Sequence, residues 1–373
     1  MTTTPRSLRR RAAWAAPVLT AAVVGGIALL PSSASASAHP ALPSRTAAQL
    51  LADVQGAQVS ALSGTVVETA RLGLPTLPGA DSAATLSLQT LVTGTHTARV
   101  WLDGPERQRL ALLGQLSESD VVHNGSDLWT YASTSQKVQH TVLPADKAAA
   151  QPDPSTDVRS VTPEGVVQQA LKAVDASTEV TVERTARVAG RPVYTLVLAP
   201  RDSRSTVRRV AIAIDAATKV PLRVQVFGAA TRPAFETAFT DVSFRRPAAS
   251  VFTFRAPQGS TVTTKALAQA VHSGTPDSRG ANGKAEAGKA GPTTLGKGWT
   301  TVAVLPAGTG TSALTGGTGS TGALLGRLTT TLPSGDRLLQ SALVNALLTK
   351  DGRVLIGAVS PAVLQQAAAG QLG

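Results

Sequence analysis

Histidines, carboxylates and glycine-rich runs are the parts of this chain from which a catalytic or metal site could be built. The histidines include no pair at metal-ligand spacing, and they are His39, His96, His123, His140 and His272. Cysteine is absent, which excludes thiolate ligands, a cysteine nucleophile, disulfides and a cysteine-linked lipid anchor. We therefore expect no metal site and no cofactor.

Two glycine-rich runs resemble nucleotide-binding motifs. Residues 317–322 match G-x-G-x-x-G, but they lie in a low-complexity tract and do not follow a strand. Residues 291–297 approach a P-loop, but Gly298 stands where Ser or Thr is needed to reach Mg²⁺. No G-x-S-x-G elbow occurs, and we expect Asp103, Asp215 and Asp241 to stabilise turns. The sequence therefore predicts a protein that is not an enzyme.

The amino terminus carries part of the positive charge. The 373 residues include 35 Lys and Arg and 23 Asp and Glu, a net charge of +12, and 42% are hydrophobic, enough for a folded core. Four arginines within residues 6–11 precede an apolar stretch at 12–30 and small residues at 31–38, as in a secretory signal peptide. We expect cleavage near Ala36 or Ala38, with an uncleaved anchor as the alternative. Removal of residues 1–38 leaves +12 − 4 = +8.

The remaining charge is scattered except for one arginine-rich turn. Its arginines are Arg201, Arg204, Arg208 and Arg209, and only Asp202 offsets them. For an exported chain, this turn predicts contact with an anionic lipid headgroup or an envelope polymer, and nucleic acid is not an expected partner. The alternative is a solvated turn between two strands.

Short β-branched segments dominate the mature chain. A helix is expected from residue 47 and another over 163–174, with Pro163 at its first position. Strands are expected at 64–69, 97–102, 108–112, 119–123, 128–132, 138–142, 180–184, 192–199, 208–215, 222–227, 234–244 and 251–255. The pattern predicts an α+β fold with an antiparallel sheet.

Several strands are apolar on both faces, which is unusual for a sheet half-exposed to water. Either helices bury both faces, or one face lines an apolar cavity. The candidate cavity residues are Leu196, Leu198, Val210, Ile212, Ile214, Val224 and Val226. The alternative for each of them is an ordinary core position.

The order of several motifs resembles a known family. Residues 194–200 read YTLVLAP, 210–223 read VAIAIDAATKVPLR, and 252–259 read FTFRAPQG. With the Asn-Gly turn and Trp-x-Tyr strand at 124–131, this series resembles the periplasmic lipoprotein-carrier family LolA and its actinobacterial relatives, over about residues 46–265. The resemblance implies an unclosed antiparallel β-barrel wrapped around helices, with a cavity for acyl chains.

The expected organisation follows from the resemblance and the composition. The ranges are a signal peptide at 1–38, a LolA-like domain at 39–271, a Gly/Ser/Lys-rich flexible linker at 272–298 and a small α+β module at 299–373. The alternative is that residues 299–373 complete the main sheet. The function implied is a monomeric, extracytoplasmic carrier or binder of lipid or lipoprotein acyl chains. A related group of sensors pairs a carrier-like domain with a second domain, so an envelope regulator that binds an anti-sigma-type membrane partner is the alternative.

Overall fold

The computed structural model describes most of the chain after residue 41. The described residues are 42–57, 59–74, 93–114, 117–144, 158–172, 174–266, 292–308 and 328–371. The predicted signal peptide and most of the predicted linker lie outside these ranges. Among the helices within them, none is long and apolar enough to cross a membrane.

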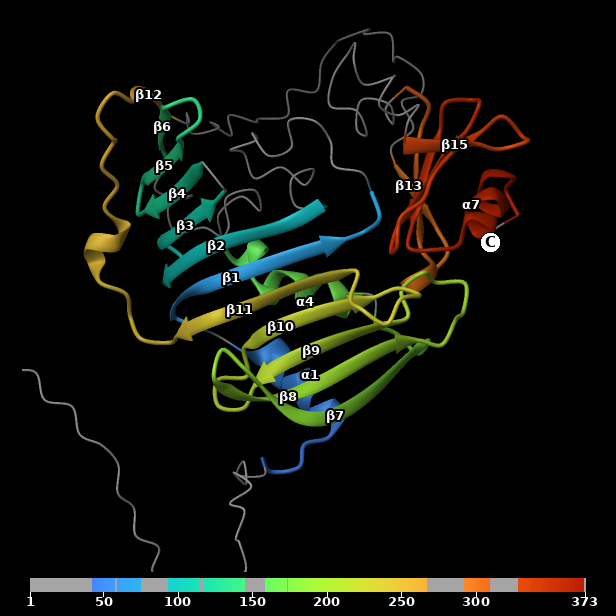
Figure 1. The fold of residues 1–373 in the computed structure, drawn as a ribbon, viewed down its shortest axis with the longest axis horizontal. Helices are drawn as coiled ribbons and strands as arrows, with labels where there is room; N and C mark the ends of the chain where they lie inside the picture. Colours follow the sequence, from blue (N-terminus) through green and yellow to red (C-terminus); the bar gives the residue numbers. More distant parts are fainter. Residues whose placement is uncertain are drawn as a thin grey trace, which may run out of the picture. The chain divides into compact units, whose positions relative to one another are not determined.

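A twelve-stranded sheet forms the main body (Figure 1). Its order is β12-β6-β5-β4-β3-β2-β1-β11-β10-β9-β8-β7, and the two end strands do not pair, so the barrel is unclosed as predicted. All neighbours are antiparallel except β12 and β6. The bounds are β1 Ala61–Arg71, β2 Thr93–Asp103, β3 Arg107–Leu113, β4 Glu118–Asn124, β5 Asp127–Ala132, β6 Lys137–Val142, β7 Thr178–Val188, β8 Arg191–Pro200, β9 Arg209–Asp215, β10 Pro221–Phe227, β11 Phe235–Ser243 and β12 Thr261–Ala266.

Two helices cover one face of this sheet and lie behind it in Figure 1. Helix α1 (Ala47–Gly56) begins with a capping box, in which the side chains of Thr46 and Gln49 each accept a hydrogen bond from the other's backbone N–H. Helix α4 (Pro163–Lys172) begins at its proline, as predicted, and follows the 3₁₀ helix η2 (Val158–Val161). Both helices pack their apolar residues against strands β8–β10. We call this side of the sheet the helix-covered face.

The segment after β11 crosses the opposite face. It contains the 3₁₀ helix η3 (Ala249–Phe252), so the strand predicted at 251–255 is wrong. Phe252 is buried, and Arg109 Nη1 on β3 donates a hydrogen bond to the Val251 carbonyl oxygen at 3.2 Å. Packing against the sheet therefore overrides the alternating pattern of the segment, and pairing resumes only at β12.

A second, six-stranded sheet forms the C-terminal module. Its order is β13-β14-β18-β17-β16-β15, with bounds Thr293–Leu295, Val302–Leu305, Val354–Gly357, Asn345–Leu348, Arg337–Leu339 and Thr329–Thr331 in that order. Helix α7 (Pro361–Ala368) packs on it and contributes Val363 and Leu364 to a separate core. The alternative that these residues complete the main sheet is therefore wrong. Strand β13 falls within the range predicted as linker.

Candidate functional site

The predicted cavity residues lie on the helix-covered face. Six of them are buried there, namely Leu196, Leu198, Val210, Ile212, Ile214 and Val224, and Val226 is partly buried beside them. Leu50 and Val54 of α1 and Val167 of α4 belong to the same cluster. In this structure, helix side chains therefore cover the residues that the sequence offered as cavity walls, and their role toward a ligand remains a prediction.

An apolar pocket lies where η2 and α4 meet the sheet. Its volume is about 20 Å³. The lining residues are Val59, Leu62, Leu102, Val158, Arg159, Thr162, Glu164, Val220, Pro221 and Phe239. Leu62, Leu102 and Phe239 come from neighbouring strands β1, β2 and β11, whereas Val158 and Glu164 come from the helical cover. The pocket is therefore a narrow apolar gap between sheet and cover.

Two polar residues interrupt the apolar surface beside this pocket. Glu68 on β1 and Thr237 on β11 are register partners, and Val224 on β10 is the next partner in the row. Glu68 is 8% exposed and Thr237 is 0% exposed, yet Glu68 Oε1 and Thr237 Oγ1 have no hydrogen-bond partner. Burial raises the pKa of the Glu68 carboxyl to about 7. The sequence reasoning missed this pair, although one acidic residue within a β-branched strand was a signal.

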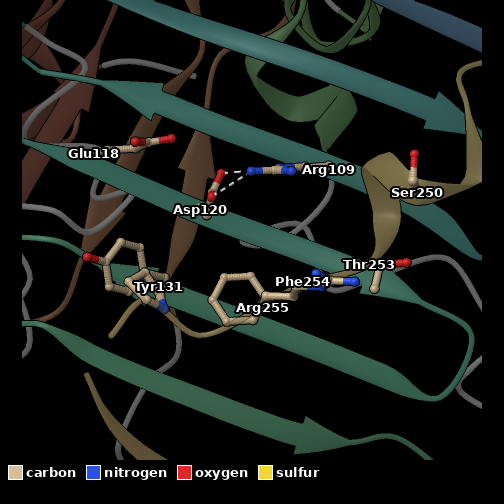
Figure 2. A pocket seen from close by; sticks show the side chains of 9 residues that line it. Arg109, Glu118, Asp120, Tyr131, Ser250, Thr253, Phe254 and Arg255 are labelled. Carbon is tan, nitrogen blue, oxygen red and sulfur yellow. Dashed lines mark hydrogen bonds and ion pairs between the residues drawn. The ribbon is translucent and has the colours of Figure 1, made fainter. Parts of the chain in front are cut away.

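The opposite face has a larger pocket, with a volume of about 520 Å³. Figure 2 shows Arg109 and Asp120 facing each other across β3 and β4, with the Tyr131 and Phe254 rings nearby. Arg109 Nη2 lies 2.8 Å from Asp120 Oδ2. The other lining residues are Glu118, Ser250, Thr253, Arg255 and Pro257. Because arginines and carboxylates both line it, this pocket does not select a ligand of one charge.

The arginine-rich turn joins β8 to β9. Arg204 pairs with Asp202 at 2.7 Å, and Arg209 pairs with Glu183 at 3.2 Å and lies over the Phe227 ring. Arg208 Nη1 donates to a backbone oxygen, and Arg201 is exposed. Half of the predicted anionic-contact arginines therefore already have a carboxylate partner, and contact with an anionic surface remains a prediction.

The backbone of the same turn meets the C-terminal module. Ser205 forms an isolated antiparallel bridge with Val359. The Thr206 N–H donates to the Ala358 oxygen at 2.9 Å, and the Ser360 N–H donates to the Arg204 oxygen at 3.0 Å. The turn is therefore a docking contact within the chain, which the sequence reasoning did not predict.

Asp215 stabilises the β9–β10 turn, as predicted. Its Oδ1 accepts hydrogen bonds from the backbone N–H groups of Ala217 and Thr218, and Arg191 pairs with both carboxylate oxygens, at 2.6 and 3.0 Å. Burial favours a higher pKa for Asp215, but the hydrogen bonds from Arg191 and Thr218 outweigh it and hold the pKa below its usual value. Asp215 is thus a structural carboxylate.

No metal centre forms within the described ranges, which contain no cluster of three or more histidines and carboxylates. The histidines within the described ranges lie in strands of the main sheet. His123 Nε2 and the Gly125 carbonyl oxygen are 2.9 Å apart, and His140 lies 2.6 Å from Asp127 and stacks on Trp129. His96 is the register partner of Glu68 on β2.

One family model matches part of the chain. Residues 94–267 match the family model of the MucB/RseB N-terminal domain. That match covers strands β2 to β12 and names a domain other than the lipoprotein carriers of the predicted family. The fold is the predicted unclosed, mostly antiparallel sheet, with helices packed on one face.

Solved structures with low sequence identity also align with the chain. The MucA/MucB complex of Pseudomonas aeruginosa is 18% identical over 86% of this chain and 96% of that chain, with a TM-score of 0.44. An uncharacterised conserved protein of Thermus thermophilus is 14% identical over 59% and 99%, with a TM-score of 0.32. A LolA-superfamily protein of Nitrosomonas europaea is 12% identical over 57% and 99%, with a TM-score of 0.21. No curated protein matches the chain.

Proposed function

We propose that this protein is an extracytoplasmic, non-catalytic binder of acyl chains, which a lipid or a lipoprotein would supply. The acyl chain would lie between the helix-covered face and the η2–α4 segment. The observation that carries the proposal is the apolar gap lined by Leu62, Leu102, Phe239 and Val158. The LolA-like fold and the MucB/RseB match support it.

The size of the gap defines how binding would occur. A volume of about 20 Å³ is far below the roughly 300 Å³ at which small-molecule sites begin. An acyl chain would therefore enter only if η2 and α4 move away from the sheet, as a lid does. Helix α4 has only ten residues, of which Pro163 and Val167 are buried and the others are partly or fully exposed.

The energetics suit such an exchange. Each buried CH₂ contributes about 0.8 kcal/mol, so a sixteen-carbon chain would gain on the order of 12 kcal/mol before ordering costs. Lifting α4 exposes Val167 and its partly buried neighbours Val166, Ala170 and Leu171. The incoming chain would replace these side chains against the same strands, so the opened sheet would not remain exposed to water.

Uptake of a fluorescent sixteen-carbon fatty acid by the chain from residue 39 tests the proposal. We expect saturable binding of the fatty acid. We also expect added lipid to change the hydrogen-exchange protection of the region where α4 contacts β10. Substitution Val262→Asp is the control, because Val262 is 48% exposed on β12, away from the gap, and should leave uptake unchanged. Absence of saturable uptake by the folded wild type contradicts the proposal.

A second candidate function is envelope sensing through an anti-sigma-type membrane partner. The MucB/RseB match and the separate C-terminal sheet favour it. In this role, residues 299–373 would contact the partner. Hydrogen exchange of the full chain with the extracytoplasmic segment of an anti-sigma factor from the same cell tests it. Protection within 328–371 is expected, and protection confined to 42–266 contradicts this partner surface.

A further inference from the structure

Glu68 and Thr237 occupy a specific position on the helix-covered face. Along β11, Thr237 lies between Phe239, which belongs to the apolar cluster around the gap, and Phe235, which packs against the cluster under α1 and α4. Along β1, Val66 precedes Glu68 on the same face and belongs to the same apolar cluster as Phe239. The pair is thus a polar point between two apolar surfaces.

The unpartnered atoms define what could bind there. A buried polar atom without a partner costs free energy, so native chains usually pair such atoms with protein, water or ligand. Here two such atoms, Glu68 Oε1 and Thr237 Oγ1, come from register partners on adjacent strands. Cross-strand partners have Cβ atoms about 5 Å apart, which lets both side chains reach one small polar group.

We propose that Glu68 and Thr237 form a polar subsite for the carbonyl group of an ester-linked or amide-linked acyl chain. The proposal rests on the acyl-binding function and names the chemistry at the head of the chain. The Glu68 carboxylic acid and the Thr237 hydroxyl each donate a hydrogen bond to the carbonyl oxygen, and the hydrocarbon lies on the apolar residues beside them. A fully apolar ligand leaves both groups unpaired.

The surrounding charges are compatible with a neutral Glu68. Burial favours its protonated form, which is the form that can donate. Other titratable or charged groups on this face are His96 on β2, directly across from Glu68, and Arg159 and Glu164, which line the gap with Phe239. A rise in pH converts the donor into a carboxylate that repels a carbonyl oxygen, so carbonyl binding weakens.

Competition binding on the chain from residue 39 tests the subsite. The competitors are methyl dodecanoate, N-methyl dodecanamide and tridecane, each displacing a pyrene-labelled alkane at pH 6. We expect the wild type to bind the ester and the amide about 3–10-fold more tightly than the alkane. That difference in affinity corresponds to the free energy of one neutral hydrogen bond or slightly more. A difference between the ester and the amide shows which of the two linkages the subsite binds more tightly.

Variants separate the subsite from general acyl binding. Glu68→Leu and Thr237→Val should bind tridecane as well as the wild type does and lose the carbonyl preference. Glu68→Gln keeps a donor and should keep the preference at pH 8, where the wild type loses it. Thr69→Val is the matched control, since Thr69 is adjacent on β1 and pairs with Thr95 on the other face. Equal wild-type affinity for all three competitors, or a preference that survives both Glu68→Leu and Thr237→Val, overturns the subsite alone. Failure of the labelled alkane to bind at all overturns the acyl-binding function.

Discussion

Trp299 Nε1 donates a hydrogen bond to Thr178 Oγ1 at 2.8 Å, and both side chains are buried. Thr178 begins β7, the end strand of the main sheet, and Trp299 precedes β14 of the C-terminal sheet. The same indole belongs to the apolar cluster that includes α1, α4 and the predicted cavity residues. The indole is therefore one of the side chains that join this cluster to the C-terminal module, together with Leu343.

Substitution Trp299→Ala should loosen this attachment. Loss of a buried aromatic ring costs about 3–5 kcal/mol, whereas Trp299→Phe retains most of the ring and loses the hydrogen bond, a cost of about 1 kcal/mol. Thermal unfolding should rank wild type, Phe and Ala in that order, and proteolysis before β14 should accelerate in the Ala variant. An Ala variant as stable and as protease-resistant as the wild type would show that this contact does not hold the module.

Glu68 should make stability fall as pH rises. Its folded pKa of about 7 lies above the ordinary 4.5, so the folded chain retains a proton that the unfolded chain releases. The stabilisation is complete below pH 4.5 and is lost as pH rises through 7, a change of about 3 kcal/mol. Urea unfolding at pH 4.5, 6 and 8 should show this slope in the wild type, and Glu68→Gln should flatten it. If the free energy of unfolding changed equally with pH in the wild type and in Glu68→Gln, the raised pKa assigned to Glu68 would be wrong.

Asp215 should make stability fall as the pH decreases. Its pKa is held below 3.8, so its stabilisation is present above pH 3.8 and is lost as pH falls through the folded pKa. Substitution Asp215→Asn leaves the Arg191 guanidinium without a charged partner and should cost about 3–5 kcal/mol at pH 7. The variant should also lose less stability than the wild type on acidification to pH 3. Asp351→Asn, at an exposed pair with Arg353, is the control and should change stability by less than about 1 kcal/mol. A comparable loss in both variants would contradict the role assigned to Asp215.

Phe239→Ala should move stability and acyl uptake in opposite directions. The substitution enlarges the gap beneath η2 and α4 and removes a buried aromatic ring, at a cost of about 3–5 kcal/mol. Fatty-acid affinity should rise, because less of the cover must move before a chain fits. Phe252→Ala removes a ring of the same size, the buried last residue of η3 on the other face, and it should destabilise the protein without raising affinity. Equal effects of the two variants on affinity would place the acyl site elsewhere.

The strands and the sheet class followed from local patterns, because β-branched alternation and turn residues act over a few positions. Residues 210–214 and 222–226 formed β9 and β10 as the pattern predicted. Strand β12 was not predicted, because all six of its residues are exposed and its pairing with β6 is long-range. The strand predicted at 251–255 failed because tertiary contacts with Arg109 and the sheet determine that segment.

The site was harder to predict than the strands. Apolar alternation identified Leu196, Ile212 and Val224 as inward-facing, but nothing in the pattern says whether a helix or a ligand covers an inward face. Glu68 and Thr237 lie 169 positions apart in sequence, a separation given by 237 − 68, and only the register of β1 with β11 brings them together. Their lack of partners is likewise a property of the packed molecule.

Native mass spectrometry of the chain from residue 39, purified from cells without added detergent, tests the acyl-binding account most directly. We expect a mass increment that fragments to acyl chains, that Phe239→Ala retains, and that a fluorescent fatty acid displaces. A protein that is folded by circular dichroism, carries no such increment and takes up no fatty acid would contradict it.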